Sequence, residues 1–251
     1  MKSNDALKVS RRSFLVLAGA AAAVLICALL PPVTFAADSA NAQTKIGIIG
    51  SGRIGSTVGE LWAKAGYQVM FSSLDLAKDK ELAERVGNGA KAGTPAEAAA
   101  FGDVLLISVP YSALPQIGRD YASSIKGKVV LDTSNPIPGR DGDMAVAAKE
   151  KGSGLASPEL LPGARLVRAF NSVGFNSLRS EAHRADPKVA IPLAADDPDA
   201  LKVAESLVVA AGFEPVYVGP LAKAKSFDPG TPVFGKALTA SELRKSLGIG
   251  S

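Results

Sequence analysis

Apolar residues along the chain gather in short runs that end at glycine or at a polar residue, and longer mixed segments separate these runs. Apolar runs of about four to eight residues, bounded by turn residues, are typical of buried strands. We therefore expect strands at residues 45–50, 67–71, 89–93, 103–109, 128–132, 164–170, 189–194 and 214–219.

The segments between these runs carry the signals that begin and end helices. Thr94, Pro95 and Glu97 supply an N-cap, a first helical residue and a capping box, and Asp197-Pro198 begins a later helix. Because strands alternate with helices, we predict an α/β fold: a Rossmann-like, doubly wound, mostly parallel sheet with helices on both faces. Helices are expected at residues 54–65, 197–211 and 241–247. Two further helices are expected, one that follows the strand at 67–71 and ends at about residue 86, and one that begins at residue 94.

The N-terminus has a different pattern from the rest of the chain. Arg11 and Arg12 lie in a basic region, and an uncharged run from 14 to 37 follows, as in a twin-arginine export signal. We expect a signal peptide at 1–42, an NAD(P)-binding domain at 43–221 and a tail at 222–251 that packs on or near it. The alternative is an uncleaved N-terminal anchor, because the start of the apolar run is just long enough to span a bilayer. Both interpretations place the domain outside the cytoplasm, in the periplasm or another extracytoplasmic space.

Composition excludes several classes of function. The net charge of +4 is modest, so we expect no nucleic-acid partner. One cysteine and one histidine cannot form a disulfide or a Cys/His metal site within the chain. The histidine, His183, lies among charged residues and is expected on a surface loop.

A glycine-rich loop follows the first predicted strand. Gly50, Gly52 and Gly55 form a G-x-G-x-x-G motif between that strand and a helix, which is the context that dinucleotide binding requires. The glycines allow a tight turn, a close approach of the backbone to a pyrophosphate and close packing of helix on strand. A glycine-rich turn without a ligand is the alternative.

The end of the second strand bears on the choice of cofactor. An acidic residue there binds the ribose hydroxyls of NAD, whereas a basic residue there binds the 2′-phosphate of NADP. This chain has Ser72 and Ser73 at that place, and Asp75 follows too late to reach the ribose. Two hydroxyl donors, with Arg53 or Lys78 as the countercharge, favour NADP(H) over NAD. The alternative is that both serines only form a turn.

Three later strand ends also carry polar or proline residues, and they belong to the same edge of a parallel sheet. We expect Val109, Pro110, Asn135 and Asn171 to hold the nicotinamide side of the cofactor. No catalytic acid or base stands out, so catalytic residues are unknown. Hydride transfer to a flavin-like ring, or electron transfer to a metal chelate, depends mainly on proximity and suits this inventory.

Four segments together carry a family resemblance: "IGIIGSGRIGSTVGELWAKAGYQVMFSS", "DVLLISVPYSALPQI", "GKVVLDTSNP" and "LVRAFNSVG". They resemble the F420-dependent NADP reductases, which have a pyrroline-5-carboxylate reductase-like NADP-binding domain, and the NADPH-binding domain of six-transmembrane metalloreductases. The resemblance covers about 45–221. It implies NADPH as the hydride donor and a deazaflavin (F420) or flavin as the second substrate. The implied phosphate-loop contacts are Ser51, Gly52, Arg53 and Ile54, and the implied 2′-phosphate contacts are Ser73 and its neighbour.

The chain departs from this family at two places. The neighbour of Ser73 is usually arginine, and here it is Leu74. The tail also does not resemble the deazaflavin-binding C-terminus of the family. Arg53 can compensate for the missing arginine, whereas the second substrate stays open.

The hypothesis from the sequence is an exported NADP(H)-dependent oxidoreductase that acts on a small-molecule redox acceptor, which is flavin-like, quinone-like or a metal chelate. The expected partners are the twin-arginine export machinery and, in a homodimer, a second copy of the chain. The alternative is a non-catalytic NADP(H)-binding module or a partner of a membrane reductase. Imine, pyrroline-carboxylate and hydroxyacid enzymes share the glycine loop, but the tail of about thirty residues is too short for their helical second domain.

Overall fold

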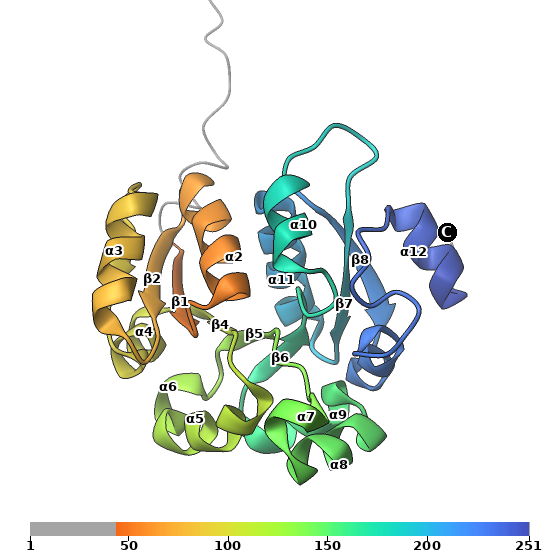
Figure 1. The fold of residues 1–251 in the computed structure, drawn as a ribbon, viewed down its shortest axis with the longest axis horizontal. Helices are drawn as coiled ribbons and strands as arrows, with labels where there is room; N and C mark the ends of the chain where they lie inside the picture. The colour runs from red at the N-terminus through yellow and green to blue at the C-terminus, as the bar shows by residue number, and fades with distance from the viewer. Residues whose placement is uncertain (1–43, 251) are drawn as a thin grey trace, which may run out of the picture. The chain divides into compact units, whose positions relative to one another are not determined.

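A computed structural model describes residues 44–250, so the expected export signal lies outside the described residues. These residues form an eight-stranded sheet in the order β3-β2-β1-β4-β5-β6-β7-β8 (Figure 1). The predicted α/β fold is confirmed, and each predicted strand is found within a few residues of its expected place. The strands are β1 (Lys45–Ile49), β2 (Gln68–Ser72), β3 (Lys91–Ala92), β4 (Val104–Ile107), β5 (Val129–Asp132), β6 (Arg165–Arg168), β7 (Ala190–Ala195) and β8 (Glu214–Gly219).

Helices connect these strands and begin at the predicted caps. The Thr94 side chain accepts a hydrogen bond from the Glu97 N–H, and the Glu97 carboxylate accepts one from the Thr94 N–H, which is the predicted capping box. The α-helices are α2 (Arg53–Lys64), α3 (Leu76–Val86), α4 (Pro95–Phe101), α5 (Leu114–Asp120), α6 (Ala122–Ile125), α7 (Pro138–Asp141), α8 (Asp143–Lys151), α9 (Ser153–Leu160), α10 (Phe175–Ser180), α11 (Pro198–Ala210) and α12 (Ala240–Leu247). Two 3-10 helices, η1 (Tyr111–Ala113) and η2 (Leu221–Phe227), complete the set.

The sheet is parallel except between β6 and β7. Val167 pairs with Ala195 and Arg168 with Ala194 in antiparallel register. The connection between the two strands holds only the six-residue α10 and a loop. It returns the chain to the sheet at the edge where β6 ended, so β7 runs in the opposite direction.

Both faces of the sheet are buried, as a doubly wound fold requires. Side chains alternate along β1, so that Ile48 belongs to the same buried cluster as Trp62 of α2, while Ile49 belongs to the cluster of Tyr111 on the other face. Strand β4, at the centre of the sheet, is therefore apolar throughout, which is why it stands out as a run in the sequence.

The tail packs against the β7–β8 end of the sheet. Val216 and Val218 of β8 share a buried cluster with Phe227 and with Leu243 of α12. The loop between η2 and α12 also reaches the ends of the central strands, because the Gly235 N–H donates to the Ser172 carbonyl over 2.7 Å. The tail thus borders the strand ends where the sequence predicts a site.

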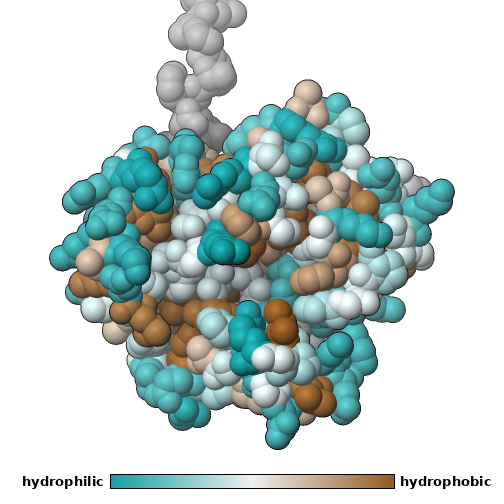
Figure 2. All heavy atoms as spheres, viewed as in Figure 1, coloured by the Kyte–Doolittle hydropathy of each residue, from teal (hydrophilic) through white to brown (hydrophobic). Residues whose placement is uncertain are grey.

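Within residues 44–250, no helix is both long enough and apolar enough to cross a bilayer. The view in Figure 2 shows neutral and hydrophobic residues near the centre of one face, over the ends of the central strands, with hydrophilic residues around them.

Candidate nucleotide-binding site

The glycine loop joins β1 to α2 at the carboxyl edge of the sheet. The N–H groups of Gly50 and Ser51 both donate to the Ser72 carbonyl over 2.9 Å, which fastens the loop to the end of β2. Helix α2 then begins at Arg53, and no side chain caps its first turn. Free N–H groups and the positive end of the helix dipole make such a helix start a binding site for an anion.

The three glycines of the motif are required for different physical reasons. A Cβ atom at Gly50 would lie 2.2 Å from the Ser108 carbonyl oxygen, and one at Gly55 would lie 2.1 Å from the Gly50 carbonyl oxygen. Gly50 also has φ +100°, which favours glycine. A Cβ at Gly52, by contrast, would meet nothing within 4 Å. The fold therefore needs Gly50 and Gly55, and the space above Gly52 is open to a ligand.

The two serines at the end of β2 differ in the availability of their hydroxyls. Ser72 is fully buried, and its Oγ donates to the Ile48 carbonyl over 2.6 Å. The proton of this hydroxyl is therefore used within the sheet, and contact between Ser72 and a 2′-phosphate stays a prediction. Ser73 is half-buried, and its Oγ donates to the Asp79 carboxylate over 2.8 Å.

Asp79 is a residue of this site that the sequence analysis missed. It lies on α3, is 1% exposed, and also accepts a hydrogen bond from the Ser51 hydroxyl. The sequence indicated no acid able to reach the end of β2, and Asp79 reaches it because the first turn of α3 brings it back over the strand end. A signal exists in the sequence: Asp79 shares the buried face of α3 with Leu82, Ala83 and Val86. An aspartate at an apolar position of a helix calls for a polar partner.

The basic residues near this point are engaged elsewhere. Lys78 pairs with Asp75, the N-cap of α3, over 2.8 Å, and hydrogen bonds from Lys78 lower the pKa of the Asp75 carboxyl. The exposed Arg53 guanidinium lies 5.0 Å from the centre of the Phe175 ring on α10. Helices α2 and α10 thus meet beside the loop, as Figure 1 shows. Leu74 is fully exposed.

The motifs "DTSNP" and "RAFN" meet at the ends of β5 and β6. Arg168 is fully buried, and its Nη1 donates to Asp132 Oδ2 over 2.6 Å and to the Ser134 carbonyl over 2.9 Å. Burial of a charge is costly unless it is paired and hydrogen-bonded, so the two motifs depend on each other. From the tail, Asp228 lies 3.7 Å from Arg168 and accepts a hydrogen bond from the Ser153 N–H.

Asn135 and Asn171 are brought together by this network. The Asn135 Nδ2 donates to the Asn171 carbonyl over 2.8 Å, and the Asn171 Nδ2 donates to Asn135 Oδ1 over 3.3 Å. Before Asn171, the buried Phe170 has φ +55°, a strained value for an aromatic residue, and its ring packs edge-on against Trp62.

Three buried side-chain atoms in and beside this network have no hydrogen-bond partner within the described residues. They are Ser134 Oγ, Asn171 Oδ1 and Arg168 Nε. Buried polar atoms in native proteins are nearly always paired, so the hydrogen-bonding capacity of this network is not fully used.

The end of β4 completes the edge. Val109 is half-buried next to the glycine loop, and Pro110 is exposed. The structure therefore places Gly50, Val109, Asn135 and Asn171 on consecutive strand ends of β1, β4, β5 and β6. Whether these residues bind a cofactor stays a prediction.

Acid–base groups contribute little to this edge. Tyr111 is fully buried, and burial raises the pKa of its phenol to about 12, so it stays protonated. His183 is exposed in the loop after α10, and its backbone N–H donates to the Gly212 carbonyl. Among residues 44–250, no cluster of three or more His, Cys, Asp or Glu side chains could hold a metal ion.

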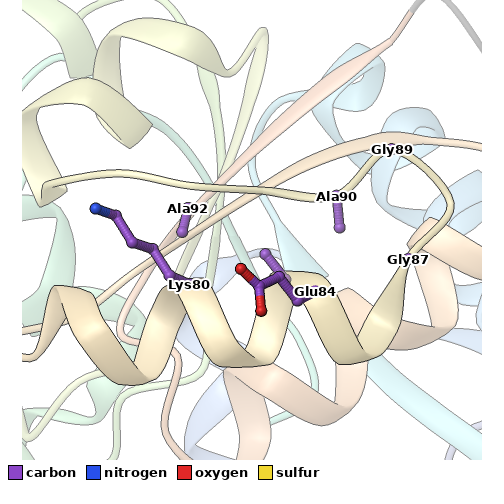
Figure 3. A pocket seen from close by; sticks show the side chains of 7 residues that line it. Lys80, Glu84, Gly87, Gly89, Ala90 and Ala92 are labelled. Carbon is purple, nitrogen blue, oxygen red and sulfur yellow. The ribbon is translucent and has the colours of Figure 1, made fainter.

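Two surface hollows lie outside this edge. One of about 350 Å³ lies between α3 and the segment leading into β3, where Lys80, Glu84 and Ala92 line it (Figure 3). Another, of about 620 Å³, lies beside α12 and is lined by Glu214 and Arg244. Neither hollow contains a residue of the glycine loop or of the Asn pair.

The strand order, the glycine loop at the start of α2 and the polar strand ends define a Rossmann-type dinucleotide-binding domain. A family model described as "NADP oxidoreductase coenzyme F420-dependent" matches residues 45–136. The F420-dependent NADP reductase of Methanothermobacter marburgensis is 30% identical over 203 residues, which cover 75% of this chain and 90% of that protein. The chain belongs to this family of F420-dependent NADP oxidoreductases, which confirms the resemblance found in the sequence.

Solved structures show the same fold. The protein SMa0349 of Sinorhizobium meliloti is 27% identical with a TM-score of 0.67, and the match covers 79% of this chain and 96% of that one. A protein of Arthrobacter sp. FB24, proposed to be an F420-dependent NADP reductase, is 16% identical with a TM-score of 0.61 and matches over 78% and 99% of the two chains. An imine reductase of Myxococcus stipitatus has a TM-score of 0.53, but only 57% of its chain is covered.

Proposed function

We propose that this protein is an exported NADP(H)-dependent oxidoreductase that transfers hydride between NADPH and a flavin-like acceptor, with the deazaflavin F420 as the first candidate. The observation that carries this proposal is the Asn135–Asn171 pair, which lies on the same sheet edge as the glycine loop and is held by the buried Arg168–Asp132 pair. The names of the relatives from Methanothermobacter supply the acceptor.

The residues at the sheet edge fit a nicotinamide dinucleotide. The open space at Gly52 and the uncapped start of α2 suit a pyrophosphate. The Asn135–Asn171 pair lies on the neighbouring strand ends, and Ser134 Oγ and Asn171 Oδ1 beside it have unused acceptor capacity. When bound, NADPH supplies the hydride. Residues at these strand ends would hold and orient it, and the Gly235 segment of the tail lies against Ser172 just after β6.

The proposed class of acceptor is one whose reduction does not require a proton donor placed by the protein. Reduction of a carbonyl needs a placed proton donor, and the phenol nearest this edge, that of Tyr111, is fully buried. Hydride transfer to a flavin-like ring depends chiefly on the proximity and orientation of two bound partners. Quinones and ferric chelates are further acceptors of this kind.

Steady-state oxidation of NADPH by the purified protein tests the proposal. The acceptors are F420, FMN, FAD, a soluble quinone and a ferric chelate. We expect turnover with F420 or a flavin, and a lower kcat for Asn171→Ala than for Asn176→Ala, an exposed asparagine of α10 that serves as the control. NADPH binding without turnover on any acceptor would support the alternative, a non-catalytic module or a partner of a membrane reductase.

Export is a separate part of the proposal, and it rests on the sequence of residues 1–42. Replacing Arg11 and Arg12 by lysine should retain the protein in the cytoplasm, whereas Lys8→Arg should not. Cell fractionation measures the location, and N-terminal sequencing of the exported protein distinguishes a cleaved signal from an anchor. Unchanged export of the double variant would exclude the twin-arginine route.

A further inference from the structure

The Asp79 carboxylate is hydrogen-bonded to the end of β2, the part of a dinucleotide-binding fold that distinguishes NADP from NAD. It accepts hydrogen bonds from the hydroxyl of Ser51, in the glycine loop, and from the hydroxyl of Ser73, at the end of β2. It is 1% exposed and lies on α3, apart from the acid position that NAD enzymes use at the strand end itself. The two serines are the donors that the family resemblance assigns to the phosphates.

A serine hydroxyl has one proton and two acceptor lone pairs. Because the protons of Ser51 and Ser73 both go to Asp79, these hydroxyls can only accept hydrogen bonds from a ligand. The Ser73 oxygen already accepts from the Asp75 N–H over 3.1 Å. A free ribose 2′-hydroxyl is itself a donor and fits such a surface, whereas a 2′-phosphate offers acceptors alone and carries the same sign of charge as Asp79.

Within the part of the chain that the structure describes, the nearby basic side chains do not pair with this carboxylate. Leu74 stands where the family has arginine, Lys78 pairs with Asp75 over 2.8 Å, and the Arg53 guanidinium lies over the Phe175 ring. We propose that Asp79 is a specificity-determining residue that relaxes the selection for the 2′-phosphate, so that the protein binds and uses NADH as well as NADPH. This inference rests on the proposed function, because it requires the glycine loop to hold a dinucleotide.

Dissociation constants for NADPH and NADH, measured by calorimetry on the purified full chain, test this inference. The isosteric Asp79→Asn removes the charge and returns a hydroxyl proton to the ligand, so the ratio of the two constants should shift toward NADPH by about tenfold, the value of one charged hydrogen bond. The matched control is Glu84→Gln, which neutralises an exposed acid on the same helix away from Ser51 and Ser73 and should leave the ratio within about twofold. An Asp79→Asn protein with an unchanged ratio would overturn the inference.

If Asp79→Asn does not fold, the binding of two adenosine nucleotides to the unaltered protein tests the same inference. Adenosine 2′,5′-bisphosphate and 5′-AMP differ only in the 2′-phosphate, and we expect their dissociation constants to lie within about tenfold of each other. Binding of the bisphosphate more than about a hundredfold tighter would overturn the role of Asp79 and leave the proposed function intact. Failure of both dinucleotides to bind would overturn the proposed function, and this inference with it.

Discussion

Arg168 of β6 donates a hydrogen bond to Asp132 of β5 over 2.6 Å, and both side chains are fully buried. The two charges lie at the carboxyl ends of adjacent strands, directly below the segments that carry Asn135 and Asn171. The pair therefore fixes the spacing of the two loops that form the nicotinamide side of the candidate site.

Loss of one member of this pair should destabilise the fold strongly. Arg168→Met leaves the Asp132 carboxylate buried without its partner, and we expect a loss of about 3–5 kcal/mol in the free energy of unfolding, measured in urea. The control is Arg165→Met, because Arg165 pairs with Asp197 at the partly exposed start of β6 and its loss should cost about 1 kcal/mol or less. Equal losses in the two variants would contradict a structural role for the buried pair.

Gly52 should matter for the ligand and not for the fold. A Cβ at this position meets no atom within 4 Å, so Gly52→Ala should unfold at the same temperature as the unaltered protein. It should nevertheless weaken NADPH binding by about tenfold or more, because the methyl group enters the space that the pyrophosphate needs. Calorimetry and thermal unfolding measure the two effects.

Gly55→Ala is the comparison for this prediction. Its methyl group would lie 2.1 Å from the Gly50 carbonyl oxygen, so it should lower stability by about 1–3 kcal/mol. If Gly52→Ala is also destabilised, or if it binds NADPH normally, the ligand-based explanation of Gly52 fails.

Leu74→Arg should increase selection for NADPH. Leu74 is fully exposed beside Ser73, so the longer side chain fits without repacking and brings a guanidinium to the end of β2. We expect NADPH to bind about tenfold more tightly and NADH to change little, since only the 2′-phosphate gains a charged hydrogen bond. Leu74→Gln is the uncharged control, and a parallel gain for NADH would show that the effect is not directed at the 2′-phosphate.

Tyr111 should make the fold sensitive to alkaline pH. Burial raises the pKa of its phenol from 10.0 to about 12 in the folded protein. The folded state therefore keeps a proton that the unfolded state loses. The resulting stability is fully present below pH 10 and is lost as the pH rises toward 12, by about 2–3 kcal/mol.

Urea unfolding at pH 9, 10 and 11 checks this prediction on Tyr111→Phe, which should lose less stability than the unaltered protein over that range. Tyr111→Phe also loses the weak hydrogen bond of 3.4 Å that the Ser157 hydroxyl donates to the phenol oxygen. This loss lowers the stability of the variant at every pH, so it does not change how steeply the free energy of unfolding depends on pH. Tyr217→Phe is the control, because it removes a phenol at an exposed position. Identical slopes for Tyr111→Phe and the unaltered protein would contradict the assignment.

The sequence by itself determined the elements of this protein and their class. Strands buried on both faces stand out as continuous apolar runs, and Thr94 and Asp197 mark helix starts by local hydrogen bonds that neighbouring residues supply. The glycine loop could also be predicted from the sequence, because a tight turn into a helix restricts the residue types at a few neighbouring positions. The loop residues and the Asn pair could be placed on one edge because parallel strands end there.

Tertiary structure alone decided which side chains are free at that edge. Ser72 and Ser73 are equivalent in the sequence, yet one is turned into the sheet and the other faces Asp79 from the next helix. The antiparallel β7 and the Arg168–Asp132 pair likewise join residues that are distant along the chain. The physical reason is that burial and hydrogen bonding depend on the packing of whole elements, whereas a sequence pattern reports the constraints within one element at a time.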